Sequence, residues 1–522
     1  GGSLTANATP PVNGTVTTVT RALTVDNALD IWNGVGTNRT SAAVRQQLLD
    51  SINFSESKQT IKTARLKLDG PLFTLPAGQM KAAVGAEAIA YDMRQVTTRT
   101  GNAGGASVST AATNLFYNRT VYAYFGEVLV PVIGPDMNIP LVQRLDVSLA
   151  GRYDHYDDFG GTTNPKYAFT WQPLDGLRLR GSWGTSFTAP ALTSRGGFNG
   201  LTGESNFTTS GQFNLPSSFP GANAFCGTTT GCTLGGASQF QGIQINGGDD
   251  KLKAQTGESH SFGFDYDPAW LGGLHVSVTY WNTDINGAIT APNSSAAVIS
   301  PGLYSRLTLN PTPAQIAAAT AGLPQSGALP ANISFIYSFR QGNAFDLRAT
   351  GLDYDVRYRF ATDNLGDFRL GFSASQKLSF DQQFSGGVIF DRLNTAGVNT
   401  TFSSLEWTGR LSLGWDLGPW SADVFYNYTN PYLNLNGNAP FTVTTSGSTV
   451  TGGQNVDAFK TVDLHVGYKF ESEGYLADTS VFADISNAFD EDPPFYNASG
   501  GYNGSDSSPM GRVVTFGISK KW

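Results

Sequence analysis

Charge is scarce in this chain of 522 residues. Only 14% of its residues are Asp, Glu, Lys or Arg, whereas soluble domains carry roughly 25%. Long apolar runs are lacking too, because no stretch approaches the ~18 consecutive apolar residues of a membrane helix. The formal net charge is −8 and no basic run occurs, so the sequence predicts no nucleic-acid partner. Low charge without a helical span is typical of strand-built proteins in which only alternate residues face lipid.

Cysteine and histidine are also rare. The two cysteines, Cys226 and Cys232, flank five small residues, so the chain can turn back and close a disulfide there. A disulfide implies an oxidising compartment, and the spacing does not indicate zinc. The four histidines are scattered without metal-ligand spacing: His155, His260, His275 and His465. We therefore expect no metal and no cofactor.

Catalytic signatures are missing as well. The sequence shows no nucleophilic serine elbow, no acid–base pair of carboxylates at a fixed spacing and no phosphate-binding loop. These patterns mark most hydrolases and nucleotide-dependent enzymes. The prediction is that the protein is not an enzyme.

What the chain has instead is alternation of apolar and polar residues. In the segment 144–154, Leu145, Val147 and Leu149 share one face and charged or small polar residues share the other. The final strand, 511–522, places Phe516 and Trp522 on its apolar face. A period of two over roughly ten residues is expected of a membrane-spanning strand. About fifteen such strands are expected, near residues 60–70, 79–95, 116–132, 141–155, 163–173, 177–189, 255–267, 272–287, 345–361, 367–380, 402–417, 419–429, 458–471, 479–487 and 511–522.

The connections between these strands alternate between short and long. Short ones carry turn residues, as in 172–176 and 362–367. Long ones are rich in Gly, Ser, Thr and Asn, and we expect them near 190–254, 288–343, 381–401, 430–457 and 488–509. Outer-membrane barrels segregate tight periplasmic turns from long extracellular loops in this way. The sequence therefore predicts an all-β, antiparallel transmembrane β-barrel in the outer membrane of a Gram-negative bacterium, with lipid against its apolar face.

The expected strand count is odd, and the first strand descends from a segment, 1–59, that we place with the extracellular loops. Bacterial single-chain barrels have an even number of strands with both ends in the periplasm. Either a strand lies within 1–59 or the chain lacks its beginning. We favour the second, with 60–522 forming the barrel.

Several motifs resemble the C-terminal part of TonB-dependent outer-membrane receptors. They occur in family order: LDGPLFTLPAGQ at 68–79, YAYFGEVLVP at 122–131, GSWGTSFTAP at 181–190, ISNAFDEDPP at 485–494, and the terminal strand. The resemblance implies a 22-stranded barrel around an N-terminal plug, of which this chain holds the last 15 strands without the plug. It also implies import of a scarce ligand, such as a siderophore, cobalamin, haem or an oligosaccharide. The implied partners are a TonB-type energy-coupling complex, reached through the missing N-terminal part, and the barrel-assembly machinery, which would read the signature at Phe516 and Trp522.

Four residues are candidates for the lumen face: Glu127, Arg152, Asp154 and His465. Glu127 lies opposite an apolar face and either pairs with a plug arginine or lines a wet lumen. Arg152 and Asp154 are expected to form a cross-strand pair that is structural rather than functional.

The loops offer two further candidates. Asp154, Asp157 and Asp158 precede a loop tip, where a solvated acidic cluster is favoured over a calcium site, which needs 6–8 oxygen ligands. Loop aromatics could stack on a ligand, but packing of the loops against one another is favoured; they are Phe198, Phe207, Phe213, Phe219, Phe225, Phe240, Tyr496 and Tyr502. Short helices are expected at 41–50, behind a Ser cap, and at 312–320, with Thr312 as its cap. No ligand-binding residue is identified.

Two other functions remain open from the residues alone. A passive, porin-like channel would have strands and no globular plug. A secreted, β-rich adhesive protein would stay soluble without detergent and would not migrate differently on gels after heating.

Overall fold

The fold is taken from a computed structural model of the chain. It describes residues 3–7, 18–22, 40–42, 54–98, 112–195, 205–292, 294, 300–385, 387, 389–396, 404–434, 441–445, 448–452, 455–471, 474–497 and 500–521.

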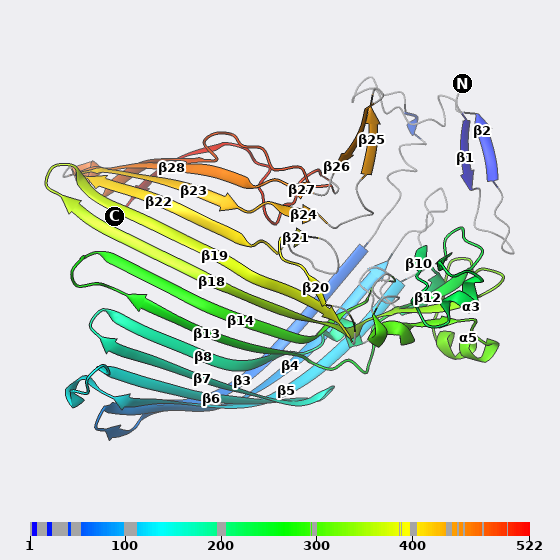
Figure 1. Cartoon of the computed structure of the whole chain (residues 1–522), viewed down its shortest axis with the longest axis horizontal. Helices are drawn as coiled ribbons and strands as arrows, with labels where there is room; N and C mark the ends of the chain where they lie inside the picture. Colours follow the sequence, from blue (N-terminus) through cyan, green and yellow to red (C-terminus); the bar gives the residue numbers. More distant parts are fainter. Residues whose placement is uncertain are drawn as a thin grey trace.

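One antiparallel sheet dominates the protein, and we call it the wall (Figure 1). Its strands follow one another in chain order, and β20 (Ile389–Asp391) pairs beside β19. The wall strands are β3 (Phe54–Leu75), β4 (Gly78–Thr98), β5 (Ala112–Ile133), β6 (Arg144–Tyr156), β7 (Gly160–Leu174), β8 (Leu177–Thr188), β13 (Gln255–Tyr266), β14 (Leu274–Thr290), β18 (Gly342–Thr362), β19 (Gly366–Phe384), β22 (Trp407–Leu417), β23 (Trp420–Thr429), β28 (Phe459–Lys469), β29 (Thr479–Ser486) and β30 (Val513–Lys520).

The predicted all-β barrel strands are confirmed one for one. Each expected segment overlaps one wall strand, and about half of the wall strands extend beyond the expected ends. For example, β3 begins at Phe54, and β18 begins at Gly342. Among the described residues, the hydrogen-bonded path runs from β3 at one edge to β30 at the other. No helix in this part of the chain is both long and apolar enough to cross a membrane.

Strand register places the apolar residues of neighbouring strands side by side. Phe516 faces Ala483, and Ala483 faces Val466 on its other side. The large side chains on this face are exposed, with 78% of Phe516 and 66% of Leu66 accessible. Because side chains alternate along a strand, most of the charged residues fall on the opposite face, although some share the parity of the apolar residues, as Lys62 and Asp92 do. We call these two faces the apolar face and the polar face.

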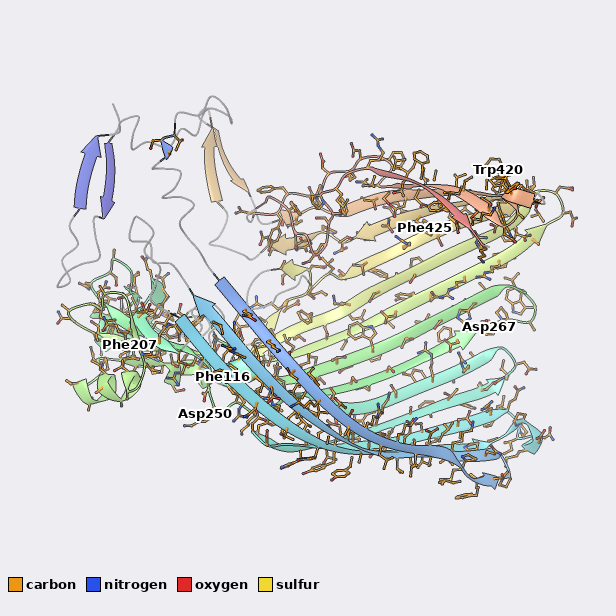
Figure 2. The ribbon with its side chains drawn as sticks, turned by 180° about the vertical axis from the view of Figure 1, so that it is seen from behind. Phe116, Phe207, Asp250, Asp267, Trp420 and Phe425 are labelled. Carbon is orange, nitrogen blue, oxygen red and sulfur yellow. A yellow bond between two sulfur atoms is a disulfide. The ribbon has the colours of Figure 1, made fainter. Side chains whose placement is uncertain are left out.

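The two ends of the wall differ. Short turns join the strands at one end, where Asp267 and Trp420 lie, whereas Phe207 and Asp250 lie in long connections at the other (Figure 2). The short-turn end includes the 3₁₀ turns η2 (Pro135–Met137) and η4 (Gly474–Leu476). The predicted alternation of connection lengths therefore corresponds to two ends of one sheet.

Two of the long connections fold together into a small unit beyond the wall, which we call the cap (205–252 and 300–341; Figure 1). The connection after β8 passes through α2 (Leu192–Arg195) into the cap, and the connection after β14 supplies the rest. The cap holds a five-stranded sheet in the order β15-β17-β12-β9-β16 and a separate hairpin, β10–β11. Its elements are β9 (Asn206–Thr209), β10 (Phe213–Leu215), α3 (Ala222–Cys226), β11 (Cys232–Leu234), β12 (Gly242–Gly247), η3 (Pro301–Arg306), β15 (Leu307–Leu309), α5 (Pro313–Thr320), β16 (Gln325–Ser326) and β17 (Phe335–Arg340).

The central pairing of the cap joins the two connections. Strand β12, from the first, runs parallel to β17, from the second. The helix α5 occupies the predicted segment, and Thr312 caps it by accepting a hydrogen bond from the Gln315 backbone N–H. The other expected helix, at 41–50, lies almost wholly outside the described residues.

The remaining long connections form a smaller cluster. Strands β21 (Thr395–Ala396), β24 (Tyr432–Asn434) and β27 (Asn455–Val456) make a three-stranded sheet. Its core includes Tyr432 and Tyr496. Two hairpins complete the described elements: β1 (Ser3–Asn7) with β2 (Thr18–Ala22), and β25 (Phe441–Thr445) with β26 (Ser448–Gly452).

Candidate functional site

The polar face of the wall carries a network of ion pairs, and Arg152 is central to one of them. Its guanidinium lies 2.9 Å from Oδ1 of Asp154 and 3.1 Å from Oε2 of Glu87. Asp154 is only 2% exposed. The expectation of a cross-strand pair between Arg152 and Asp154 is wrong, because both residues are on β6, two positions apart. The cross-strand partner is Glu87 on β4.

The other lumen candidates also lie on the polar face. Glu127 alternates with Tyr124 and Val128 and accepts a hydrogen bond of 3.3 Å from the Ser148 hydroxyl. His465 lies 2.6 Å from Oδ1 of Asp484 on the next strand. In the described ranges no three His, Cys, Asp or Glu side chains come close enough together to hold a metal ion.

The short-turn end of the polar face holds a further group of arginines. Arg178 and Arg180 both contact Asp265, at 2.8 and 3.2 Å. Arg369 pairs with Asp416 and, at 3.0 Å, with Asp423. Sequence reasoning missed these groups, although the signal was present: arginine and aspartate recur at alternate positions on several strands.

The acidic loop tip is tied to the wall at Asp158, whereas Asp157 is exposed. The Arg119 guanidinium donates to both carboxylate oxygens of Asp158 and, at 2.7 Å, to the Pro190 carbonyl. Arg195 lies 3.6 Å from Asp158, and Asp157 accepts a hydrogen bond from the Thr120 backbone. Arg119 is 7% exposed and lies over the rings of Tyr156 and Phe159. This contact fixes the start of the connection to the cap.

Five of the loop aromatics, Phe207, Phe213, Phe219, Phe225 and Phe240, pack inside the cap, whereas Tyr496 packs in the smaller loop cluster. Phe213 and Phe219 are buried in one cluster with Phe335, and Phe225 lies 4.7 Å from Phe240, centroid to centroid. The favoured expectation, that they pack the loops together, fits these positions. Phe198 lies outside the described residues. In the same unit Cys226 and Cys232 form a disulfide that closes the α3–β11 connection.

Two polar side chains brace the second of the two connections that form the cap, the one between β14 and β18. The Tyr337 hydroxyl donates to the Pro292 carbonyl, and burial raises the pKa of that phenol. The Arg306 guanidinium donates to the carbonyls of Ser338 and Arg340, and burial lowers the pKa of Arg306. Both groups bind main-chain oxygens, so they fix the fold of that connection.

The C-terminal strand presents an apolar groove on the outside of the wall. The groove has a volume of about 840 Å³ and is lined by Trp420, Tyr468, Val481, Phe516 and Ile518. Trp522, the other half of the expected signature, lies outside the described residues.

Comparison with known proteins identifies the fold. A search of curated protein sequences found no match. Among solved structures, the siderophore receptor PirA from Acinetobacter baumannii matches with a TM-score of 0.53 and 14% identity, over 88% of this chain and 54% of that one. A variant of the ferric enterobactin receptor from Pseudomonas aeruginosa, in complex with enterobactin, matches with a TM-score of 0.53 and 15% identity, over the same shares.

The chain thus spans about half the length of these receptors. At such low identity the likeness shows the fold alone. A family comparison adds the membership: residues 5–488 match the family described as TonB dependent receptor-like, beta-barrel. The order of motifs, the strand wall and this match agree, and the chain belongs to the TonB-dependent receptor β-barrel family.

Proposed function

We propose that this chain is the barrel portion of an outer-membrane receptor that imports a scarce ligand in an energised step. The observation that carries the proposal is the division of one sheet into an exposed apolar face and a polar face rich in ion pairs. An apolar outer face suits lipid, and a charged inner face suits a wet or domain-filled lumen. Import, rather than passive diffusion, is supported by the family and by the siderophore receptors that share the fold.

The parts of the chain take the following roles in this proposal. The barrel begins with β3 at Phe54, a few residues before the expected start at residue 60, and the segment before it lies with the extracellular loops. The cap and the smaller loop cluster stand at the extracellular end and meet the ligand first. Glu127, Arg152, Asp154 and His465 line the lumen. A siderophore, cobalamin, haem or an oligosaccharide is the ligand class, and a TonB-type complex supplies the energy.

Lipid and the barrel-assembly machinery are the proposed partners of the outer surface. The apolar groove beside β30 supports both roles, because Phe516 and Ile518 lie exposed at its rim. A lipid chain or an assembly factor would cover apolar area there that water solvates poorly.

Uptake assays test the proposal. Bacteria carrying the complete gene should accumulate a radiolabelled ligand from the four classes, whereas a deletion strain should not. An uncoupler of the proton-motive force should abolish that accumulation. Accumulation that survives the uncoupler, with open-channel conductance in planar bilayers, would instead establish a passive channel. A product that stays soluble without detergent would establish a secreted protein.

A further inference from the structure

The polar face holds an arginine pocket that the proposed function does not use. Its volume is about 360 Å³, and four arginines line it: Arg357, Arg359, Arg369 and Arg410. It lies near the short-turn end, because β18 ends at Thr362 and β19 begins at Gly366. In the proposed orientation this is the periplasmic end of the lumen.

The register brings two of these arginines directly opposite each other. Arg359 on β18 pairs with Arg369 on β19, and Arg357 pairs with Gly371, the next position on the same face. Like charges directly opposite each other on neighbouring strands destabilise a sheet. A pair of facing arginines is therefore favourable only where an anion offsets the repulsion.

Nearby carboxylates offset the charges of three of these arginines but not the charge of Arg359. Arg369 is held by Asp416 and Asp423, and Arg357 lies 2.9 Å from Asp355. Arg410 donates to Asn427 and lies 3.5 Å from Asp463. For Arg359, the described residues supply no ion pair and no acceptor for the guanidinium. Arg359 is exposed towards the pocket, so its five donors are available to a ligand.

Two glycines line the arginine pocket at positions where a side chain would fill it. A Cβ at Gly414 would lie 2.8 Å from Nε of Arg369, closer than real Cβ contacts allow, so any side chain there would displace that guanidinium. At Gly371 a Cβ would collide with the Ser412 hydroxyl. Both glycines line the pocket, so the space beside Arg369 stays open, and the hydroxyl of Ser373 also lines it.

We propose that the arginine pocket binds an oxyanion, a carboxylate or phosphate group carried by a small soluble ligand. The planar fork of Arg matches two oxygens of such a group, which gives short, charge-assisted hydrogen bonds. The oxyanion sits between Arg359 and Arg369 and takes a hydroxyl donor from Ser373. The carboxylates that hold Arg357 and Arg369 orient the donors and leave the charge of Arg359 to the ligand.

The test is calorimetric titration of the purified chain in neutral detergent, with citrate and inorganic phosphate as probes at low ionic strength. The parent chain should bind at least one probe. Arg359→Gln should weaken binding about tenfold or more, which corresponds to about 1.4 kcal/mol. Raising the salt concentration should weaken binding of the parent more than that of the variant, because exposed charges are screened.

A matched control removes the same charge elsewhere. Arg348 lies on the same strand as Arg359, near its other end, where it pairs with Asp284. Arg348→Gln should leave probe binding unchanged. Because Arg359 is exposed and has no partner in the described part of the chain, its variant should fold, and an unchanged heat-dependent shift on gels would show that it does.

Three outcomes would overturn the proposal. One is equal binding by the parent and Arg359→Gln. The second is no binding of either probe by the parent. The third is binding only of an acidic peptide, which would assign the pocket to a protein segment in the lumen. None of these results bears on the uptake assay, so failure here and failure of the proposed function are distinguishable.

Discussion

The wall and the cap place their apolar side chains in opposite ways. The wall exposes large apolar side chains, including 78% of Phe516, and gathers its charges on the other face. The cap buries its apolar side chains, with Phe335 and Leu234 at 0% exposure. The wall therefore leaves its apolar side chains exposed and has no core between its two faces, whereas the cap has a core of its own.

The cap and the wall also differ in their content of charged residues. The cap segments 206–248 and 307–339 contain no Asp, Glu, Lys, Arg or His, whereas arginine and aspartate alternate along the wall strands. The cap, whose few charged residues lie outside these two segments, is held by apolar contacts, a disulfide and hydrogen bonds to main-chain carbonyls. A wall without a core is held by its ladder of backbone hydrogen bonds and by ion pairs. The two regions should therefore respond differently to the same kinds of mutation.

The largest effect is expected in the core of the cap. Phe335→Ala removes a ring with no exposed surface, and such truncations cost about 3–5 kcal/mol. Hydrogen exchange should accelerate at amides of the cap and remain slow along the wall strands. Thr229→Ala, at an exposed position of the same unit, should change neither. Equal acceleration in wall and cap would show that the two regions are one folding unit.

A charge on the apolar face should destabilise the wall slightly less than Phe335→Ala destabilises the cap. Leu149→Arg places a cation where lipid is expected, at a cost of about 2–4 kcal/mol near the bilayer midplane. Ser148→Arg, the neighbour on the polar face, should cost much less, because Glu127 lies within its reach. Urea unfolding from lipid vesicles measures both. Equal losses would mean that the two faces are not distinguished by lipid.

Loss of the disulfide should loosen the cap alone. The bond joins residues six positions apart, and closing so short a loop stabilises a fold by roughly 2–3 kcal/mol. The double variant Cys226→Ser with Cys232→Ser should melt earlier in the cap and become insensitive to reductant. The parent treated with reductant should behave like the variant. A wall that melted earlier as well would contradict the independence of the two regions.

The smallest effect is expected in the cluster of the remaining loops. The Tyr432 hydroxyl accepts a hydrogen bond of 3.0 Å from the Asn503 amide, and Tyr432→Phe should cost about 1 kcal/mol. Burial raises the pKa of Tyr432 above its ordinary value of 10.0, and the charge of Asp506 raises that pKa further.

The raised pKa gives this prediction a pH dependence. The neutral hydroxyl contributes stability that is fully present below the ordinary pKa and is lost as the pH rises through the folded one. The stability of the parent cluster should therefore fall at strongly alkaline pH. Tyr432→Phe should lack that part of the fall when both are followed by tyrosine absorbance and hydrogen exchange. An identical pH profile in parent and variant would show that Tyr432 is not the responsible group.

Most of the wall could be predicted from the sequence, because the alternation of apolar and polar residues is a local pattern. The alternation around Val147 and Leu149, and around Phe516, selects a strand and says which side chains share a face. The long and short connections follow from turn residues in the same way. Strand ends were less accurate: β18 starts at Gly342, within the range expected for a loop, because the pairing partner rather than the pattern decides where a strand stops.

The candidate site was predicted only in part. The alternation in the sequence placed Arg152 and Asp154 on one face of their strand. It did not predict the contact between Arg152 and Glu87, because that contact depends on the register of β4, β5 and β6. It suggested an acidic loop tip at Asp158, and only the structure brought Arg119 and Arg195 to it. The arginine pocket depends wholly on register, since Arg359 and Arg369 meet across a hairpin.

By itself, the sequence determined the all-β class, the apolar and polar faces of the strands, the alternation of turns and loops, and the family. These properties are local, or are sums of local patterns. The tertiary structure alone decided that two loops separated by two wall strands fold into one cap, because the parallel pairing of β12 with β17 has no local signature. It also decided which charges on the polar face meet, because ion pairs depend on distances of a few ångströms that only the sheet register sets.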